Sequence, residues 1–321
     1  MMGSEELIDL GLSNIWKAWF AFRKGKRMSD EMHEFQYHLE SRLFELHKDL
    51  NEGTYKHGNY RHFMVCDNKR REISVSPIRD RIVHRLLYDY LVPIWDKTFI
   101  YDAWSCRKGK GLLGAIERTH QFLKSYPNSY IWRSDVQKFF DNVDQRVLFE
   151  LLKRRVRDRR ALLLIREVLK SHSTHAEGVG MPIGNLTSQI FSNIYLNELD
   201  RLVKYELKPQ AYLRYGDDFV LFEADEKKLE NMKAVTAEFL SEELKLTLHS
   251  KNNLIVKARH GLKFLGTQLW SSGRRLSKRN KIRITSRLNP RNTPSYHGVI
   301  SKHGNEKMQK WLNWRVHMLM D

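Results

Sequence analysis

The sequence has little cysteine, and its two cysteines do not form a ligand pair. Cys66 and Cys106 are the only cysteines among 321 residues, and they stand far apart in the chain. This spacing argues against a disulfide framework and against a cysteine-ligated zinc site, and it favours a reducing compartment. We therefore expect a cytoplasmic protein.

Long apolar runs and a basic N-terminus are also absent. No segment approaches the roughly eighteen consecutive apolar residues that a spanning helix requires, so we expect no membrane association. Residues 1–12 contain Glu5, Glu6 and Asp9 but neither lysine nor arginine, unlike a secretory signal.

The sequence has few acidic residues relative to basic ones. The chain has 56 Lys and Arg against 38 Asp and Glu, a net charge of +18. The excess is polarised, because residues 271–321 contain twelve basic residues and only two acidic ones. A concentrated positive charge favours a polyanionic partner such as nucleic acid. The 41% of hydrophobic residues is enough for a sizeable core, which argues against a disordered chain.

The hydrophobic periodicity predicts an α+β fold with helices packed on a small antiparallel sheet. Strands are expected at residues 60–65, 72–75, 130–136, 211–215, 219–222, 246–248, 253–256 and 262–269. Helices are expected at residues 28–50, 79–94, 115–123, 185–205 and 229–240, with two more between 144 and 169. Ser29 or Asp30 is the expected cap of the first of these helices.

Three carboxylates occupy strand ends. Asp217 and Asp218 stand in a turn between two apolar strands, and Asp135 ends another apolar strand. A hairpin tip with two solvated acids is one interpretation. If the strands are neighbours, however, the carboxylates converge into an oxygen-rich site for a hard cation such as Mg²⁺. Two such ions, roughly 3.5–4 Å apart, can activate a 3′-hydroxyl and stabilise leaving pyrophosphate. We expect two Mg²⁺, for which Mn²⁺ can substitute.

Several motifs, in order, resemble those of reverse transcriptases of the bacterial retroelement kind. Asp135 with Phe139-Phe140 is similar to the family's first aspartate motif, and Tyr215-Gly216-Asp217-Asp218 is similar to its Tyr-x-Asp-Asp box. Residues 180–189 resemble the intervening motif, Phe264-Leu265-Gly266 the primer-grip hairpin, and residues 71–81 and 105–109 the fingers motifs. The likeness covers about residues 50–270.

The intervening motif resembles one subfamily most. Group II intron and viral enzymes usually carry Pro-Gln-Gly in this motif, whereas Ile183-Gly184-Asn185-Leu186-Thr187-Ser188-Gln189 is similar to the enzymes of diversity-generating retroelements. The chain departs from that subfamily at Gly216, where Met, Val or Ala is usual. The resemblance implies an RNA-directed DNA polymerase that copies a structured template RNA into cDNA from dNTPs, with errors at adenines. It also implies a small, basic, helical accessory variability protein as a partner.

The resemblance further implies a right-hand polymerase. Residues 1–50 would form a helical arm, residues 51–130 and 145–180 the fingers, and residues 130–145 and 180–270 the palm with its small sheet. Residues 271–321 would form a basic, α-helical thumb.

Site roles follow from the same resemblance. Asp135, Asp217 and Asp218 would be catalytic and bind the metal ions. Phe139 would crowd the sugar 2′ position, and Ile183, in place of a hydrogen-bonding Gln, would lower fidelity. The full nucleotide-binding set is Arg71, Arg107, Phe139, Ile183, Gly184 and Lys251, and the template and primer set is Gln189, Tyr215, Phe264, Leu265 and Gly266.

Three other functions fit parts of the sequence. One is another bacterial reverse transcriptase, for example an antiphage-defence type. The second is an RNA-dependent RNA polymerase, because Gly-Asp-Asp is also typical of those enzymes. The third is an RNA-binding scaffold with an inactive polymerase fold. Primer extension with separate dNTP and NTP sets would discriminate between the classes of polymerase.

Overall fold

In the computed structural model, which describes residues 7–66, 70–304 and 306–318, the chain alternates between two units. The first unit contains residues 1–99, 138–199 and 239–246, and the second contains residues 100–137, 200–238 and 247–321. Each unit is described by itself below.

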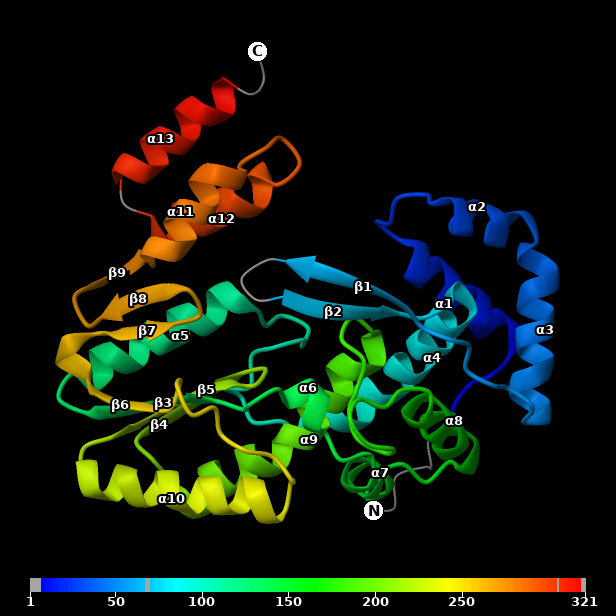
Figure 1. The fold of residues 1–321 in the computed structure, drawn as a ribbon, viewed down its shortest axis with the longest axis horizontal. Coiled ribbons are helices and arrows are strands. Elements are labelled where there is room, and N and C mark those ends of the chain that lie inside the picture. Colours follow the sequence, from blue (N-terminus) through cyan, green and yellow to red (C-terminus); the bar gives the residue numbers. More distant parts are fainter. Residues whose placement is uncertain (1–6, 67–69, 305, 319–321) are drawn as a thin grey trace. The chain divides into compact units, whose positions relative to one another are not determined.

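The first unit is mainly helical (Figure 1). Helix α1 (Leu12–Arg23) packs against α3 (Leu39–Glu52) and α4 (Ile78–Trp95), and Trp19 of α1 stacks on Phe35 of α2 (Asp30–Tyr37) at 5.1 Å. Strands β1 (Arg61–Cys66) and β2 (Arg70–Val75) form an antiparallel hairpin. Residues 67–69, between the two strands in the sequence, lie outside the described residues. The unit also contains α6 (Phe139–Asn142), α7 (Gln145–Lys153), α8 (Arg159–Lys170) and most of α9 (Leu186–Arg201).

The predicted helix over residues 28–50 is two helices. Its start is as expected, because the Ser29 side chain accepts a hydrogen bond from the backbone of Met32. The prediction of one continuous helix was wrong, because His38 leaves the helical conformation at φ −104° and ψ 26° and separates α2 from α3.

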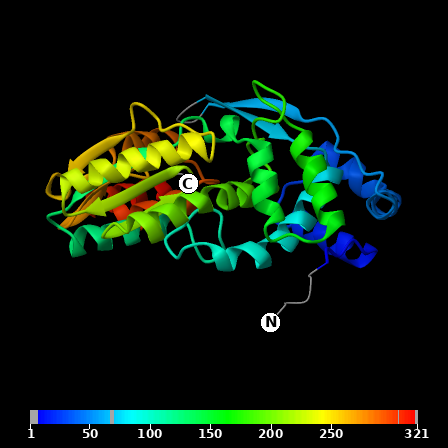
Figure 2. The ribbon, with the colours of Figure 1, turned by 90° about the horizontal axis from the view of Figure 1, so that it is seen from below.

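The second unit is built on a four-stranded antiparallel sheet in the order β4-β5-β3-β6. The strands are β3 (Tyr130–Asp135), β4 (Ala211–Tyr215), β5 (Asp218–Glu223) and β6 (Leu254–Lys257). Helices α5 (Leu112–Ser125) and α10 (Glu226–Glu242) lie on opposite faces of this sheet (Figures 1 and 2). The expected strand at residues 246–248 is reduced to a single bridge between Leu248 and Val136.

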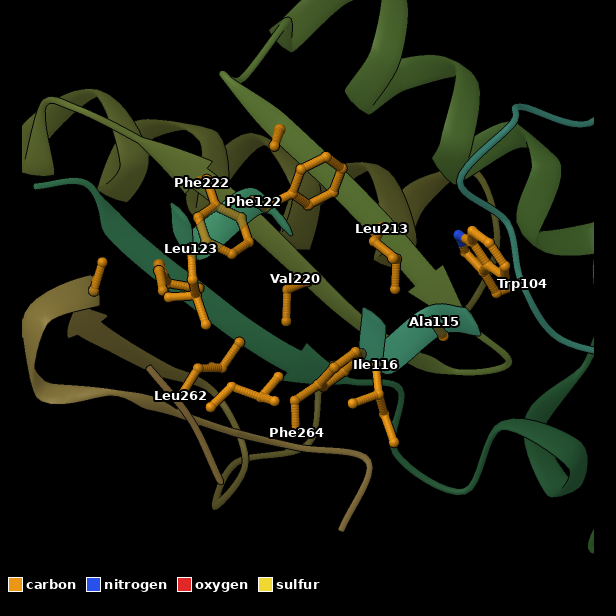
Figure 3. Close-up of a cluster of buried hydrophobic side chains, with 14 residues drawn as sticks. Trp104, Ala115, Ile116, Phe122, Leu123, Leu213, Val220, Phe222, Leu262 and Phe264 are labelled. Carbon is orange, nitrogen blue, oxygen red and sulfur yellow. The ribbon is translucent and has the colours of Figure 1, made fainter. Parts of the chain in front are cut away.

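An apolar cluster holds α5 on the sheet (Figure 3). Phe122 of α5 meets Phe222 of β5 edge-on at 5.7 Å between ring centroids, and Leu213 and Val220 of the hairpin strands are fully buried. Each fully buried side chain of this size contributes about 1.5–3 kcal/mol. The cluster therefore fixes the strands whose ends carry the aspartates.

A three-stranded sheet and three helices complete the second unit. The sheet contains β7 (Leu262–Phe264), β8 (Thr267–Trp270) and β9 (Gly273–Leu276), and the helices are α11 (Lys278–Arg287), α12 (Thr293–His303) and α13 (Glu306–His317). Strand β9 was not expected, since residues from 271 onward were predicted to be helical. The predicted helix at 185–205 ends as α9 at Arg201 and continues as a π-helical segment, Leu202–Leu207. None of the described helices has the length and apolar character needed to cross a membrane.

Candidate active site

The Tyr215–Asp218 box is a tight hairpin turn between β4 and β5. Tyr215 pairs with Asp218, so Gly216 and Asp217 form a two-residue loop. Gly216 has φ +65°, whereas Asp217 does not adopt a positive φ. Glycine with positive φ at the first loop position is typical of a type II′ turn, whose twist matches that of the flanking strands. Gly216 thus satisfies a conformational requirement of the turn.

Strand pairing brings the third aspartate to this turn. Asp135, at the end of β3, lies directly opposite Asp218 of β5. The amide of Val136 donates to the Asp217 carbonyl at 3.3 Å, which identifies Asp135 and Asp218 as a non-hydrogen-bonded pair. The Cα atoms of such a pair are about 4.5 Å apart, and both side chains lie on the same face of the sheet. The expected convergence of the aspartates is therefore present in the backbone register.

Polar contacts surround these carboxylates. The side-chain amide of Asn252 donates to Asp135 Oδ2 at 3.2 Å, and a guanidinium nitrogen of Arg133 lies 3.5 Å from Asp218 Oδ1. The other oxygen of Asp135 is buried and has no hydrogen-bond partner among the described residues. A buried carboxylate oxygen without a donor is costly, so this atom fits a cation ligand.

The aspartates do not form a complete metal cage by themselves. Among the described residues, no three His, Cys, Asp or Glu side chains are arranged to hold an ion alone. Mg²⁺ commonly binds through one or two carboxylates and takes its remaining oxygens from water and substrate phosphates. The donor set at Asp135, Asp217 and Asp218 fits that mode of binding.

Two expected nucleotide-binding residues belong to the same unit. Arg107 is half-buried, and its Nη1 donates to the carbonyls of Ile100 and Ala103 at 2.8 and 3.1 Å. Lys251 is exposed on a loop that borders Asp135, since His249 of that loop donates its amide to the Asp135 carbonyl. Lys251 thus belongs to a loop that is bonded to the backbone of Asp135, while Arg107 has a structural role in its own loop. Phosphate contacts for either residue remain predictions.

The expected primer-binding residues lie beside a basic groove. Phe264 is only 1% exposed, and Leu265 and Gly266 form a turn with φ of +46° and +77°. The groove has a volume of about 1090 Å³. No acidic residue is found among its described lining residues, whose six cations are Arg133, Lys263, Arg275, Lys278, Arg279 and Lys281. Such a surface suits a phosphate backbone. Tyr215 is half-buried, and burial raises the pKa of its hydroxyl.

The remaining predicted residues lie in the first unit. The amide of Ser74 on β2 donates to the Ile183 carbonyl at 3.1 Å. Gly184 has φ +113°, and a Cβ there would lie 3.0 Å from Ile73 Cγ2. The turn at Ile183-Gly184 is therefore fitted against the β1–β2 hairpin and favours glycine. Arg71 on β2 and Gln189 on α9 are exposed.

The two phenylalanines after Asp135 have different environments. Phe139 is 2% exposed, and its ring lies 6.2 Å from that of Tyr195. Phe140 is half-buried. The side chain of Phe139 thus belongs to the core of the first unit, and Phe140 is the ring with exposed surface.

Some residues in contact with the site were not predicted from the sequence. Arg133 is two residues before Asp135 on the same strand face, so the alternation of strand residues was a usable signal. Asn252 is 117 residues from Asp135, and no local pattern connects them. Arg214, beside the box, bonds to Asp200 fourteen residues earlier.

Carboxylates at the end of a small antiparallel sheet, with a basic groove that shares Arg133 with them, form the arrangement expected of a template-directed polymerase. The chain matches the family model described as reverse transcriptase (RNA-dependent DNA polymerase) over residues 54–269, more than half of its length. It therefore belongs to the reverse transcriptase family, and it is an RNA-directed DNA polymerase.

The chain is also similar to individual known proteins. The chain is 26% identical to Protein YkfC of Escherichia coli (strain K12) over 262 residues, which cover 69% of this chain and 68% of YkfC. It is 24% identical to the group II intron-encoded protein LtrA of Lactococcus lactis subsp. cremoris over 177 residues, 51% of this chain but only 28% of LtrA. Telomerase from Candida albicans, solved in complex with a TWJ fragment of telomeric RNA, aligns with a TM-score of 0.51 at 11% identity. That alignment covers 77% of this chain and 50% of the telomerase chain, and it supports the right-hand polymerase fold.

Proposed function

We propose that this chain makes cDNA from a structured template RNA by two-metal nucleotidyl transfer, within a diversity-generating retroelement. The observation that carries the chemistry is the register that sets Asp135 opposite Asp218, with Asp217 in the adjoining turn. The subfamily is supported by residues 183–189, in which Ile183 stands in place of the Gln typical of intron and viral enzymes.

Each part of the site has a proposed task. Asp135, Asp217 and Asp218 would hold two Mg²⁺, which when bound supply charge stabilisation for the attacking and leaving oxygens. Lys251 would contact the leaving pyrophosphate, because it is exposed on the loop that borders Asp135. The basic groove would bind the primer strand through its phosphates. We assign the sugar-sensing role to Phe140, since the ring of Phe139 is buried.

The proposed partners are the template RNA, the growing cDNA, dNTPs and an accessory variability protein. Besides the groove of the second unit, a smaller one of about 230 Å³ lies on α7 and α8 of the first unit. Lys153, Arg159 and Arg166 line it, and Arg166 lies over the Phe149 ring at 4.8 Å. Cations beside a half-buried aromatic ring suit RNA backbone and base contacts.

Primer extension on an RNA template tests the proposal. We expect extension with dNTPs but not NTPs, Mg²⁺ or Mn²⁺ dependence, and misincorporation concentrated at template adenines. Asp217→Asn should abolish synthesis while RNA binding persists, and Glu226→Gln, an exposed carboxylate on α10, is the matched control. Extension with NTPs alone would replace the proposal by an RNA polymerase, and faithful copying of adenines would remove the mutagenic role.

A second candidate is an enzyme of an intron-type retroelement. It is favoured by the intron-encoded relatives of the chain, such as LtrA. The same sequenced products separate the two, because an intron-type enzyme should show no bias toward errors at adenines. An antiphage-defence enzyme would share the chemistry and would be distinguished by its template.

A further inference from the structure

A buried ion pair lies directly behind the aspartate turn. Arg214 on β4 and Asp200 in the last turn of α9 are 1% and 0% exposed. The guanidinium binds the carboxylate through two bonds, Nε to Oδ1 at 2.8 Å and Nη2 to Oδ2 at 2.6 Å. Tyr212, also buried, donates its hydroxyl to Asp200 Oδ1 at 2.7 Å. The planar fork of arginine matches this bidentate geometry, which a lysine does not reproduce.

The remaining nitrogen of the same guanidinium contacts the turn. Nη1 of Arg214 donates to the Gly216 carbonyl at 3.0 Å. The peptide that precedes Asp217 is therefore fixed by Arg214, and the peptide that follows it is fixed by Val136, whose amide donates to the Asp217 carbonyl. Both peptides that flank Asp217 are therefore hydrogen-bonded, one to Arg214 of the buried ion pair and one to Val136, which follows Asp135.

Arg214 is itself held by its own backbone. Its amide donates to the Asp102 carbonyl at 3.0 Å, and its carbonyl accepts from the Trp104 amide at 2.9 Å. Burial disfavours the charge on Arg214, but the Asp200 carboxylate more than offsets this and raises the guanidinium pKa. The arginine thus stays charged, and its position is fixed by partners on two sides.

We propose that Arg214, oriented by Asp200, is a positioning residue that sets the conformation of the Gly216–Asp217 peptide and thereby the metal affinity of the aspartate site. A buried ion pair gives little stability in itself, because desolvation of both charges opposes their attraction. Groups behind metal ligands, by contrast, typically change metal affinity or activity by about 10–100-fold when they are removed. The contact with Gly216 is the feature that stability alone does not explain.

The test separates positioning from folding. The double variant Asp200→Leu with Arg214→Met removes both charges and leaves an apolar pair, so it is expected to fold, as such replacements often do. Mn²⁺ binding is measured by electron paramagnetic resonance without substrate, and kcat and the KM for dNTP are measured by primer extension. We expect Mn²⁺ affinity and kcat to fall about tenfold or more, with the KM for dNTP changing less than about threefold. Tyr212→Phe is the control, since it removes a bond to Asp200 but leaves the Gly216 contact.

The inference rests on the proposed metal-dependent synthesis, and the outcomes distinguish the two. Wild-type protein that neither binds Mn²⁺ nor extends a primer contradicts the proposed function. A folded double variant with wild-type Mn²⁺ affinity and kcat contradicts the positioning role alone. Equal losses of Mn²⁺ affinity in Tyr212→Phe and the double variant also contradict it, because the effect then follows packing around Asp200. Arg214→Lys, which keeps a charge for Asp200 but loses the fork, should resemble the double variant.

Discussion

Replacement of Gly216 by alanine tests the geometry of the aspartate turn. Gly216 has φ +65°, and a Cβ added there would meet only Ser105 Oγ, at 3.8 Å. The space is thus sufficient, and the cost is that of the left-handed backbone, about 1–2 kcal/mol for a residue with a side chain. This corresponds to a fall in melting temperature of about 2–8 °C for a unit of 150–250 residues.

Thermal unfolding followed by circular dichroism, together with primer extension, measures this effect. Gly53→Ala is the control, because Gly53 has φ +73° at the end of α3 and its added Cβ would meet nothing within 4 Å. Both variants should lose similar stability, but only Gly216→Ala should also lower kcat and the apparent affinity for Mg²⁺. A Gly216→Ala protein as stable as wild type would show that the turn is not left-handed. A loss above about 4 kcal/mol would show a steric clash that the structure does not contain.

Three further predictions concern single side chains. Phe140→Ala should raise the use of NTPs relative to dNTPs in primer extension, whereas Phe139→Ala should mainly lower the free energy of unfolding by about 3–5 kcal/mol. Increased NTP use by Phe139→Ala alone would assign the sugar-sensing role to Phe139 instead. Ile183→Gln should lower misincorporation in sequenced products by restoring a hydrogen-bonding side chain, and an unchanged error spectrum would contradict this role. Burial, and secondarily the nearby charge of His57, lowers the pKa of His84 to about 3. At pH values between about 6.5 and this lowered pKa, the imidazole binds a proton more readily in the unfolded chain than in the folded one. The free energy of unfolding should therefore fall as the pH falls from about 6.5, by up to about 1.4 kcal/mol per pH unit. Chemical denaturation of wild type and His84→Gln at several pH values measures the difference, and equal slopes would contradict it.

The sequence was informative where strands carry their own pattern. Apolar runs on both sides of Asp217 and before Asp135 predicted three strand ends, and the pairing of β5 with both β3 and β4 confirmed that they meet. The motif order likewise predicted the reverse transcriptase family and the polymerase fold, which the family match confirmed. These features can be predicted from the sequence because the apolar pattern of a strand and of its flanking residues is local.

Other features depended on contacts that no local pattern encodes. The break at His38 interrupts a segment whose apolar spacing continues across it, so periodicity alone predicted one helix. Phe139 is buried and its ring contacts Tyr195, a residue on another helix, whereas Phe140 keeps exposed surface. The bond from Arg214 to Asp200 joins a strand to a helix end, and a basic residue beside the aspartate box was equally compatible with solvent exposure.

The turn between β7 and β8 shares an acceptor with the first helix of the C-terminal segment. The Gly266 carbonyl accepts from the Ser277 amide at 3.1 Å and from the Asn280 side chain at 3.0 Å, at the start of α11. A helix anchored in this way cannot tilt without pulling the turn with it. A tilt of α11 would therefore also displace this turn, whose Gly266 lines the basic groove.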